Sequence, residues 1–224
     1  MSYFSRVTLK PQKLAPERLA SLFCDDGYKE HQALWHLFSN DSKADRDFLF
    51  RRDDLFQGLR YFVISQREPE DRDGLWVIES KHYKPIVQPG QKLAFSLRVN
   101  PVVKRKSDDG KSRRHDVVMD AKRRITSERV EKQMHVLDVA QKEGAEWLAK
   151  RAARYGFSTN EEAIRIEAYY QHRSFKKDKR ISYSTLDISG ELTVDNPDLF
   201  VESLTNGIGP AKAFGCGLLL VRKM

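Results

Sequence analysis

The order of strand-like and helix-like segments is the feature that most restricts the fold of this chain. Runs that alternate apolar and polar residues predict strands, and an apolar period near 3.6 predicts helices. Strands are expected at residues 3–9, 47–52, 59–66, 76–80, 92–103, 115–119, 165–175, 181–194 and 217–222, and helices at 28–38, 137–155 and 197–204. Each half then approximates the β-α-β-β-α-β order of a ferredoxin-like unit.

The predicted fold class is α+β, with two tandem ferredoxin-like domains. Residues 1–103 are expected to form the first domain, 104–114 a basic junction loop, and 115–224 the second domain with a glycine-rich loop. The pattern supplies no second helix for the first domain. The charged stretch 121–134 is expected to be partly helical.

Composition excludes several classes of protein. Hydrophobic residues make up 40% and charged residues 32% of the 224 residues, which fits a globular chain rather than a disordered one. No apolar run approaches the roughly 18 residues of a membrane span, and no signal peptide is visible. Two cysteines, Cys24 and Cys216, are too few for a disulfide framework or a structural zinc site. A reducing cytoplasm is the expected location.

Two short segments hold the whole net charge of +8. Residues 104–114 contain six basic and two acidic residues, and residues 173–180 contain five basic and one acidic residue. The candidate RNA-binding residues in them are Lys104, Arg105, Lys106, Arg113, Arg114, Arg173, Lys176, Lys177 and Arg180. Both segments are expected to be loops, which suits binding to a phosphate backbone. The alternative, a solubilising surface, is not excluded by charge alone.

A glycine-rich stretch near the end of the chain carries Gly207, Gly209, Gly215 and Gly217 around Lys212. It matches neither a P-loop nor a dinucleotide fingerprint. Its amides and Lys212 are suited to contacting a phosphate. The sequence by itself favours the alternative, a tight connection that leads into the last strand.

Tyr28 and His31 are three residues apart, so on a helix they share one face. Histidine exchanges a proton near neutral pH, and a tyrosine one turn away can hydrogen-bond a reacting hydroxyl. Spacing alone favours the alternative that His31 extends the apolar stripe of Leu34, Trp35 and Phe38.

No set of residues has the spacing of a metal site. Asp45 and Asp47 lack a third ligand, and the sequence has no HExxH pattern. His115 and His172, each beside an arginine, are expected to neighbour phosphates instead. Most of the aromatic rings at 48, 50, 169 and 170 are expected to pack in the core rather than stack on bases.

Three segments together resemble the CasE family, the CRISPR RNA-processing endoribonucleases of the Cascade complex. They are YKEHQALWHLF (28–38) followed by DFLF (47–50), LRVNP (97–101) before the basic segment, and GIGPAKAFGCGLL (207–219). Only about 121–137 finds no match. The resemblance implies two ferredoxin-like domains and a substrate, the stem-loop of the CRISPR repeat, cut at the 3′ base of its stem.

The resemblance also implies a metal-independent reaction without cofactor, in which the ribose 2′-OH attacks the phosphate. It implies His31 as the catalytic histidine and Tyr28 as its assistant, with His31 either base or acid. It further implies that Lys212 contacts RNA and that other Cascade subunits are partners. The alternatives are a non-catalytic hairpin-binding subunit of the same fold and, less favoured, a metal-dependent nuclease.

Overall fold

The structure is a computed structural model that describes residues 2–17, 27–39, 45–53, 56–106, 110–127, 135–176 and 179–224. Within these ranges, no helix combines the length and the apolar character that crossing a membrane requires.

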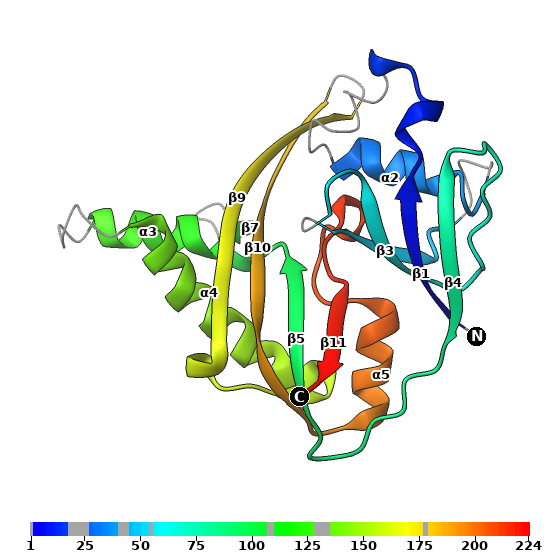
Figure 1. The fold of residues 1–224 in the computed structure, drawn as a ribbon. Helices are drawn as coiled ribbons and strands as arrows, with labels where there is room; N and C mark the ends of the chain where they lie inside the picture. Colours follow the sequence, from blue (N-terminus) through cyan, green and yellow to red (C-terminus); the bar gives the residue numbers. More distant parts are fainter. Residues whose placement is uncertain are drawn as a thin grey trace.

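The first domain is one antiparallel sheet with a helix against it (Figure 1). Its strands are β1 (Ser2–Leu9), β2 (Phe48–Arg52), β3 (Arg60–Ser65) and β4 (Trp76–Tyr83), in the spatial order β2-β3-β1-β4. Helix α2 (Gly27–Trp35) follows β1, after the short helix η1 (Pro11–Lys13). Residues 66–75, which connect β3 to β4, are all described and contain no helix. The first domain therefore lacks the second helix of a ferredoxin-like unit, in agreement with the sequence pattern.

Alternation along β2 gives this sheet two buried faces. Phe48 and Phe50 lie in one apolar cluster with Leu34 of α2 and Tyr61 of β3. Leu49 points to the other face. A strand buried on both faces explains why the sequence FLF is continuously apolar.

The second domain repeats the strand order of the first. Its strands are β5 (Lys92–Val99), β8 (Phe157–Ser158), β9 (Ile164–Lys176), β10 (Lys179–Val194) and β11 (Leu219–Lys223). The order β11-β5-β10-β9 corresponds to β4-β1-β3-β2, and the short β8 pairs with the far end of β10. The prediction of two ferredoxin-like domains is confirmed.

Three helices accompany this second sheet: α3 (Val117–Ser127), α4 (Val136–Ala152) and α5 (Pro197–Asn206). The expected helices at 137–155 and 197–204 correspond to α4 and α5. Asn196 caps α5 by accepting the Leu199 amide, and Pro197 occupies its first turn. Short 3₁₀ helices η2 (Ala153–Tyr155), η3 (Glu161–Ala163) and η4 (Lys212–Phe214) complete the chain.

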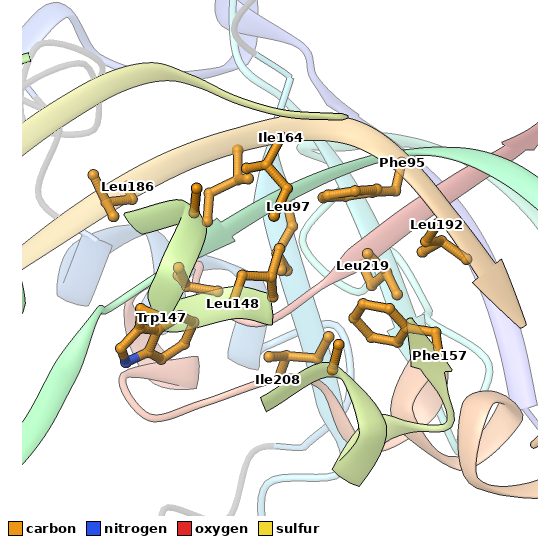
Figure 2. Close-up of a cluster of buried hydrophobic side chains, with 14 of the residues drawn as sticks. Phe95, Leu97, Trp147, Leu148, Phe157, Ile164, Leu186, Leu192, Ile208 and Leu219 are labelled. Atoms are coloured by element: carbon orange, nitrogen blue, oxygen red, sulfur yellow. The ribbon is translucent and has the colours of Figure 1, made fainter. Parts of the chain in front are cut away.

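The core of the second domain lies between its sheet and α4 (Figure 2). Leu97 of β5, Leu148 of α4 and Leu186 of β10 are all fully buried there. Phe157 and Phe200 meet edge to face with ring centroids 6.0 Å apart. The shared burial of alternate strand residues fixes the register of β5 against β10.

Two expectations about this region are wrong in detail, and a third, a partly helical stretch 121–134, is confirmed as far as the described residues extend. The strand expected at 92–103 is β5, and it belongs to the second sheet, so the sheets change over at residues 84–91 rather than at residue 103. The strand expected at 115–119 is β7 (Ser112–Asp116), after which the chain turns into α3. The stretch 121–134 is helical as far as Ser127, and 128–134 lie outside the described residues.

The end of the second domain packs on the outer face of the first sheet. Leu49 and Ile64 form a small buried cluster with Leu218, and the partly buried Leu220 of β11 packs against it. The two sheets are therefore joined by apolar contact as well as by the 84–91 connection, which places the glycine-rich loop beside α2 (Figure 1).

Candidate active site and nucleic-acid interface

Helix α2 carries both residues of the candidate reactive pair. Its position over β2 is fixed by an ion pair between the buried Glu30 carboxylate and Arg52, with Oε1 and Nη1 3.3 Å apart. His31 is half-buried: its ring stacks on Phe48 and Phe50 with centroids 5.4 and 6.2 Å apart. Its Nδ1 is buried, but the residue as a whole retains exposed surface. His31 thus joins the aromatic stripe without being sealed inside it.

Tyr28 faces the second domain. Its ring lies 6.5 Å from that of Phe214 in η4, and Phe214 in turn lies 4.5 Å from Tyr183 of β10. Tyr183 stacks on His172 of β9, with centroids 4.8 Å apart and planes within 17°. Four rings therefore form a continuous row from α2 to the second sheet.

The close approach of α2 to this row requires a glycine at its first position. A Cβ on Gly27 would lie 3.0 Å from the Tyr183 hydroxyl and 3.1 Å from the Phe214 backbone. These distances are shorter than ordinary van der Waals contacts, so a larger residue would push the helix away from the row.

The glycine-rich loop is a packed connection at this boundary. The Gly207 amide donates to Ser203 O, the Ile208 amide to Gly217 O, and the Gly217 amide to Arg98 O, over 2.7–2.9 Å. A Cβ on Gly207, where φ is +74°, would lie 2.8 Å from the Leu49 side chain. These three amides already donate hydrogen bonds within the protein. This part of the loop therefore fits the alternative of a tight connection that leads into the last strand. Gly209 and Gly215 also have positive φ.

Lys212 is half-buried beside the loop, and burial together with the positive charge of Arg46 lowers the pKa of its ammonium. Burial also lowers the pKa of the Arg46 guanidinium. Arg46 precedes β2 and comes from the other domain, so two cations from separate domains lie close enough to repel each other.

The first basic segment is a β-hairpin, not the expected loop. Strands β6 (Val102–Lys106) and β7 (Ser112–Asp116) pair antiparallel, so that Lys104 faces Arg114 and Arg105 faces Arg113. All four are exposed, and so is Lys106. Arg105 donates to Asp120 of α3 (Nη2 to Oδ2, 2.7 Å), which anchors the hairpin. Like charges placed opposite each other favour an anionic ligand between or over them.

The second basic segment is also built on strands. Arg173 lies exposed on β9 opposite Ser182, and the backbones of Lys176 and Arg180 belong to β9 and β10. The side chains of Lys176 and Arg180 lie outside the described part of the structure, as does the whole of Lys177. The hairpin predicted at 165–194 is confirmed, and its strands extend further than expected.

The two basic segments meet at one cavity of about 500 Å³. Arg114 of β7 and Arg173 of β9 both line it, and so do His172 and Tyr183 of the ring row. His172 Nε2 lies 2.8 Å from the Thr185 hydroxyl. The row of rings therefore leads from an arginine-lined cavity to Tyr28 on α2.

Comparison with known proteins identifies the family. The model of a family described as "CRISPR associated protein" matches residues 2–223. The chain belongs to this family. It is 29% identical over 203 residues to the CRISPR system Cascade subunit CasE of Escherichia coli K12, covering 90% of this chain and 94% of that protein. It is 27% identical over 240 residues to the CRISPR-associated endoribonuclease Cse3 of Thermus thermophilus, covering 98% and 99%.

Solved structures of family members share the fold. Thermus thermophilus Cse3 bound to an RNA representing a pre-cleavage complex matches with a TM-score of 0.72 and 22% identity, over 99% of this chain and 98% of that one. Cas6e from Escherichia coli K-12 matches with a TM-score of 0.60 and 24% identity, over 99% and 100%. At these identities the likeness supports the two-domain architecture.

Sequence reasoning missed three contributors to the site of this CRISPR-associated protein. Phe214 and Tyr183 connect Tyr28 to the second sheet, and Arg46 adds a cation beside Lys212. Arg46 lies in a stretch without periodicity, where no local signal separates a functional arginine from a surface one. In the parts of the chain that are described, no group of three or more metal-ligating side chains is found.

Proposed function

We propose that this chain is an endoribonuclease that cleaves CRISPR precursor RNA at the 3′ base of the repeat stem-loop and keeps the hairpin as a Cascade subunit. Family membership supports this, as do the names of two relatives, a Cascade subunit and an endoribonuclease. The observation that carries the proposal is the row of rings that links the arginine-lined cavity to the helix with Tyr28 and His31.

The second domain supplies the grip on the stem. A-form RNA hides its base edges in a deep, narrow major groove, so a folded stem is recognised through its shape and phosphates. The exposed cations of β6, β7 and β9 suit such contacts because they lie on strands of fixed spacing. In this proposal Lys104, Arg114 and Arg173 bind phosphates of the stem, and its base reaches α2.

The first domain supplies the chemistry. The 2′ oxygen next to the scissile bond forms a bond to phosphorus while the bond from phosphorus to the 5′ oxygen breaks. One proton leaves the 2′-OH and one reaches the departing 5′ oxygen, which yields a 2′,3′-cyclic phosphate and a 5′-OH. His31 performs one of these transfers, typically worth about 10²–10⁴-fold in rate. Tyr28 orients the hydroxyl, and no metal takes part.

Lys212 has a matching electrostatic role. Negative charge grows on the phosphoryl oxygens as the phosphorane forms, and a half-buried ammonium stabilises it more than an exposed one would. Lys212 belongs to the same loop as Phe214, which packs against Tyr28.

One observation favours the second candidate, a non-catalytic hairpin-binding subunit. His31 stacks on two phenylalanines, and its Nδ1 is buried, as in a histidine that only fills a core. Both candidates predict hairpin binding, and only the first predicts cleavage that depends on this ring.

The test is to incubate the purified protein with a repeat hairpin RNA in excess chelator and to identify the product ends by mass spectrometry. A 2′,3′-cyclic phosphate on the 5′ fragment and a 5′-OH on the 3′ fragment are expected. Tight binding without cleavage would favour the second candidate, and cleavage only after Mg²⁺ is added would contradict the proposed chemistry.

A further inference from the structure

A groove of about 520 Å³ lies between the two domains, apart from the arginine-lined cavity. Its walls come from the edge of the first sheet and the end of α5. The residues that matter here are Arg46, Phe48, Ser65, Gln66, Thr205 and Asn206. Most of these are uncharged polar residues, so the charge of the groove depends on its few ionised groups.

Among the described residues, none compensates the positive charge of Arg46 in this groove. Asp47 also lines it, but Arg67 donates to both carboxylate oxygens, from Nε at 2.5 Å and Nη2 at 2.9 Å. Arg46 is half-buried and makes no hydrogen bond or ion pair with any residue that the structure describes. A partly desolvated guanidinium without a carboxylate is costly unless an anion binds it.

A second cation lies beside Arg46. Lys212 of η4 is not among the residues that line the groove, but η4 contacts β2, and the pKa of Lys212 is lowered by burial and then by the charge of Arg46. Lys212 likewise makes no ion pair within the described ranges. A phosphate bound at Arg46 relieves the repulsion between the two cations and accepts charge-assisted hydrogen bonds from the guanidinium.

The groove is connected to the candidate reactive pair around the edge strand β2. It lies on the Leu49 face of the first sheet, whereas the Phe48 ring stacks on His31 on the other face. Arg46 precedes β2, and η4, which contacts β2, packs against α2 through Phe214 and Tyr28. An RNA strand that leaves α2 around this edge therefore meets the positive charge of Arg46.

Resting on the proposed function, we propose that this groove binds a phosphodiester of the unpaired RNA strand that continues from the base of the stem, with Arg46 as its main cation. Guanidinium groups bind phosphate through two parallel hydrogen bonds, which also fixes the direction of the strand. Arg46 is thus a positioning residue: it holds the unpaired flank next to the base of the stem.

The experiment compares three RNAs: the hairpin ending at the base of the stem, the same hairpin with a 5′ extension, and with a 3′ extension. Affinity is measured over a range of salt concentrations for the wild type, Arg46→Gln and Arg46→Lys. Lys84→Gln is the matched control, because Lys84 is an exposed cation in the 84–91 connection. The extension that responds to the variant identifies the flank that occupies the groove.

Arg46→Gln is expected to bind the bare hairpin like the wild type and to bind one extended RNA about tenfold more weakly, because the charge-assisted hydrogen bonds to its phosphate are lost. The slope of log affinity against log salt should become shallower by about 0.7 for that RNA only. Arg46→Lys should keep most of this slope, and Lys84→Gln should change nothing specific to an extension.

If Arg46→Gln loses affinity equally for all three RNAs, or loses none for either extended RNA, the proposal that the groove binds the unpaired strand is wrong. A second variant guards against misfolding at position 46: Asn206→Asp adds a negative charge to the opposite wall at constant shape. It should weaken the same extended RNA, and failure to do so would also overturn the proposal. If the wild type cuts no RNA but Arg46→Gln still loses affinity for one extended RNA only, the groove proposal is supported and the nuclease proposal is wrong.

Discussion

The two domains share one strand order and differ in what covers their sheets. In the second domain α4 and α5 accompany the sheet, and a single large core holds them together. In the first domain α2 lies against the sheet, and Leu14 and Leu75, from irregular segments, pack against its core. The first domain therefore depends on its neighbour: the loop and strand that follow α5 cover the outer face of its sheet.

This difference shows how two domains of the same topology can be suited to different roles, one to binding and one to catalysis. The second domain is complete, and its extra hairpin β6–β7 carries exposed cations suited to binding. The first domain leaves α2 against the boundary, where it packs on η4 of the second domain. In the proposed function, catalysis belongs to the less complete domain and stem binding to the more complete one.

The sharpest test of this division is His31→Ala. Because one proton transfer is lost, cleavage should slow by about 10²–10⁴-fold, while hairpin affinity stays within twofold. Single-turnover cleavage and filter binding measure the two quantities. His36→Ala, in the exposed turn after α2, should leave both unchanged. Cleavage by His31→Ala at the wild-type rate would contradict the assignment of catalysis to the first domain.

The binding side is tested with Lys104→Gln combined with Arg114→Gln, which removes one cross-strand cation pair. Affinity should fall by about tenfold or more, and the salt slope should become shallower by roughly 0.7–0.9 for each lost phosphate contact. Cleavage at saturating protein should remain near the wild-type rate. Lys84→Gln with Lys92→Gln removes the same charge elsewhere, and an equal effect of that pair would refute a specific role for the hairpin.

The dependence of the first domain on the loop is tested with Gly207→Ala. The added Cβ lies 2.8 Å from the Leu49 side chain at a φ of +74°, so the free energy of unfolding should fall by about 2–4 kcal/mol. Gly90→Ala has a similar φ of +79° but open space around it, and about 1 kcal/mol is expected there. Urea titration compares the two, and equal losses would show that Leu49 does not hold the loop.

The smallest effect concerns Cys216, which is fully buried. Burial raises the pKa of its thiol from 9.0 to about 12. The unfolded thiol ionises first as the pH rises, so stability is retained below pH 9 and falls between pH 9 and 12. From pH 8.5 to 9.5 the loss should be about 0.7 kcal/mol. Cys216→Ala should lack this loss in paired urea titrations, and identical pH profiles would refute it.

Local patterns predicted most of the fold because burial imposes them. The alternation of Leu93, Phe95, Leu97 and Val99 predicts β5, but it fits either sheet equally well and does not decide to which domain the strand belongs. Its pairing depends on β10, which lies about 90 residues further along the chain. The pattern does not predict the basic hairpin, because its exposed strands carry no apolar alternation.

The candidate site was predictable only where a charge run or a resemblance indicated it. Arg114 and Arg173, which line the cavity, belong to the predicted basic segments. Tyr28, His31 and Lys212 followed from the family, and their roles remain predictions. The neighbours that give them a setting, Phe214 and Arg46, did not, because contacts between distant segments leave no trace in a single sequence.

Tyr28 and Phe214 are in contact in the folded protein but are synthesised at different times. Roughly 180 residues of synthesis separate the helix from the loop that it packs on. At about 5–20 residues per second, α2 emerges some 10–40 s before its neighbour is made. During that interval a nascent chain carries His31 without its neighbours from the second domain. If the proposed function holds, RNA cleavage therefore begins only after the second domain has folded against α2.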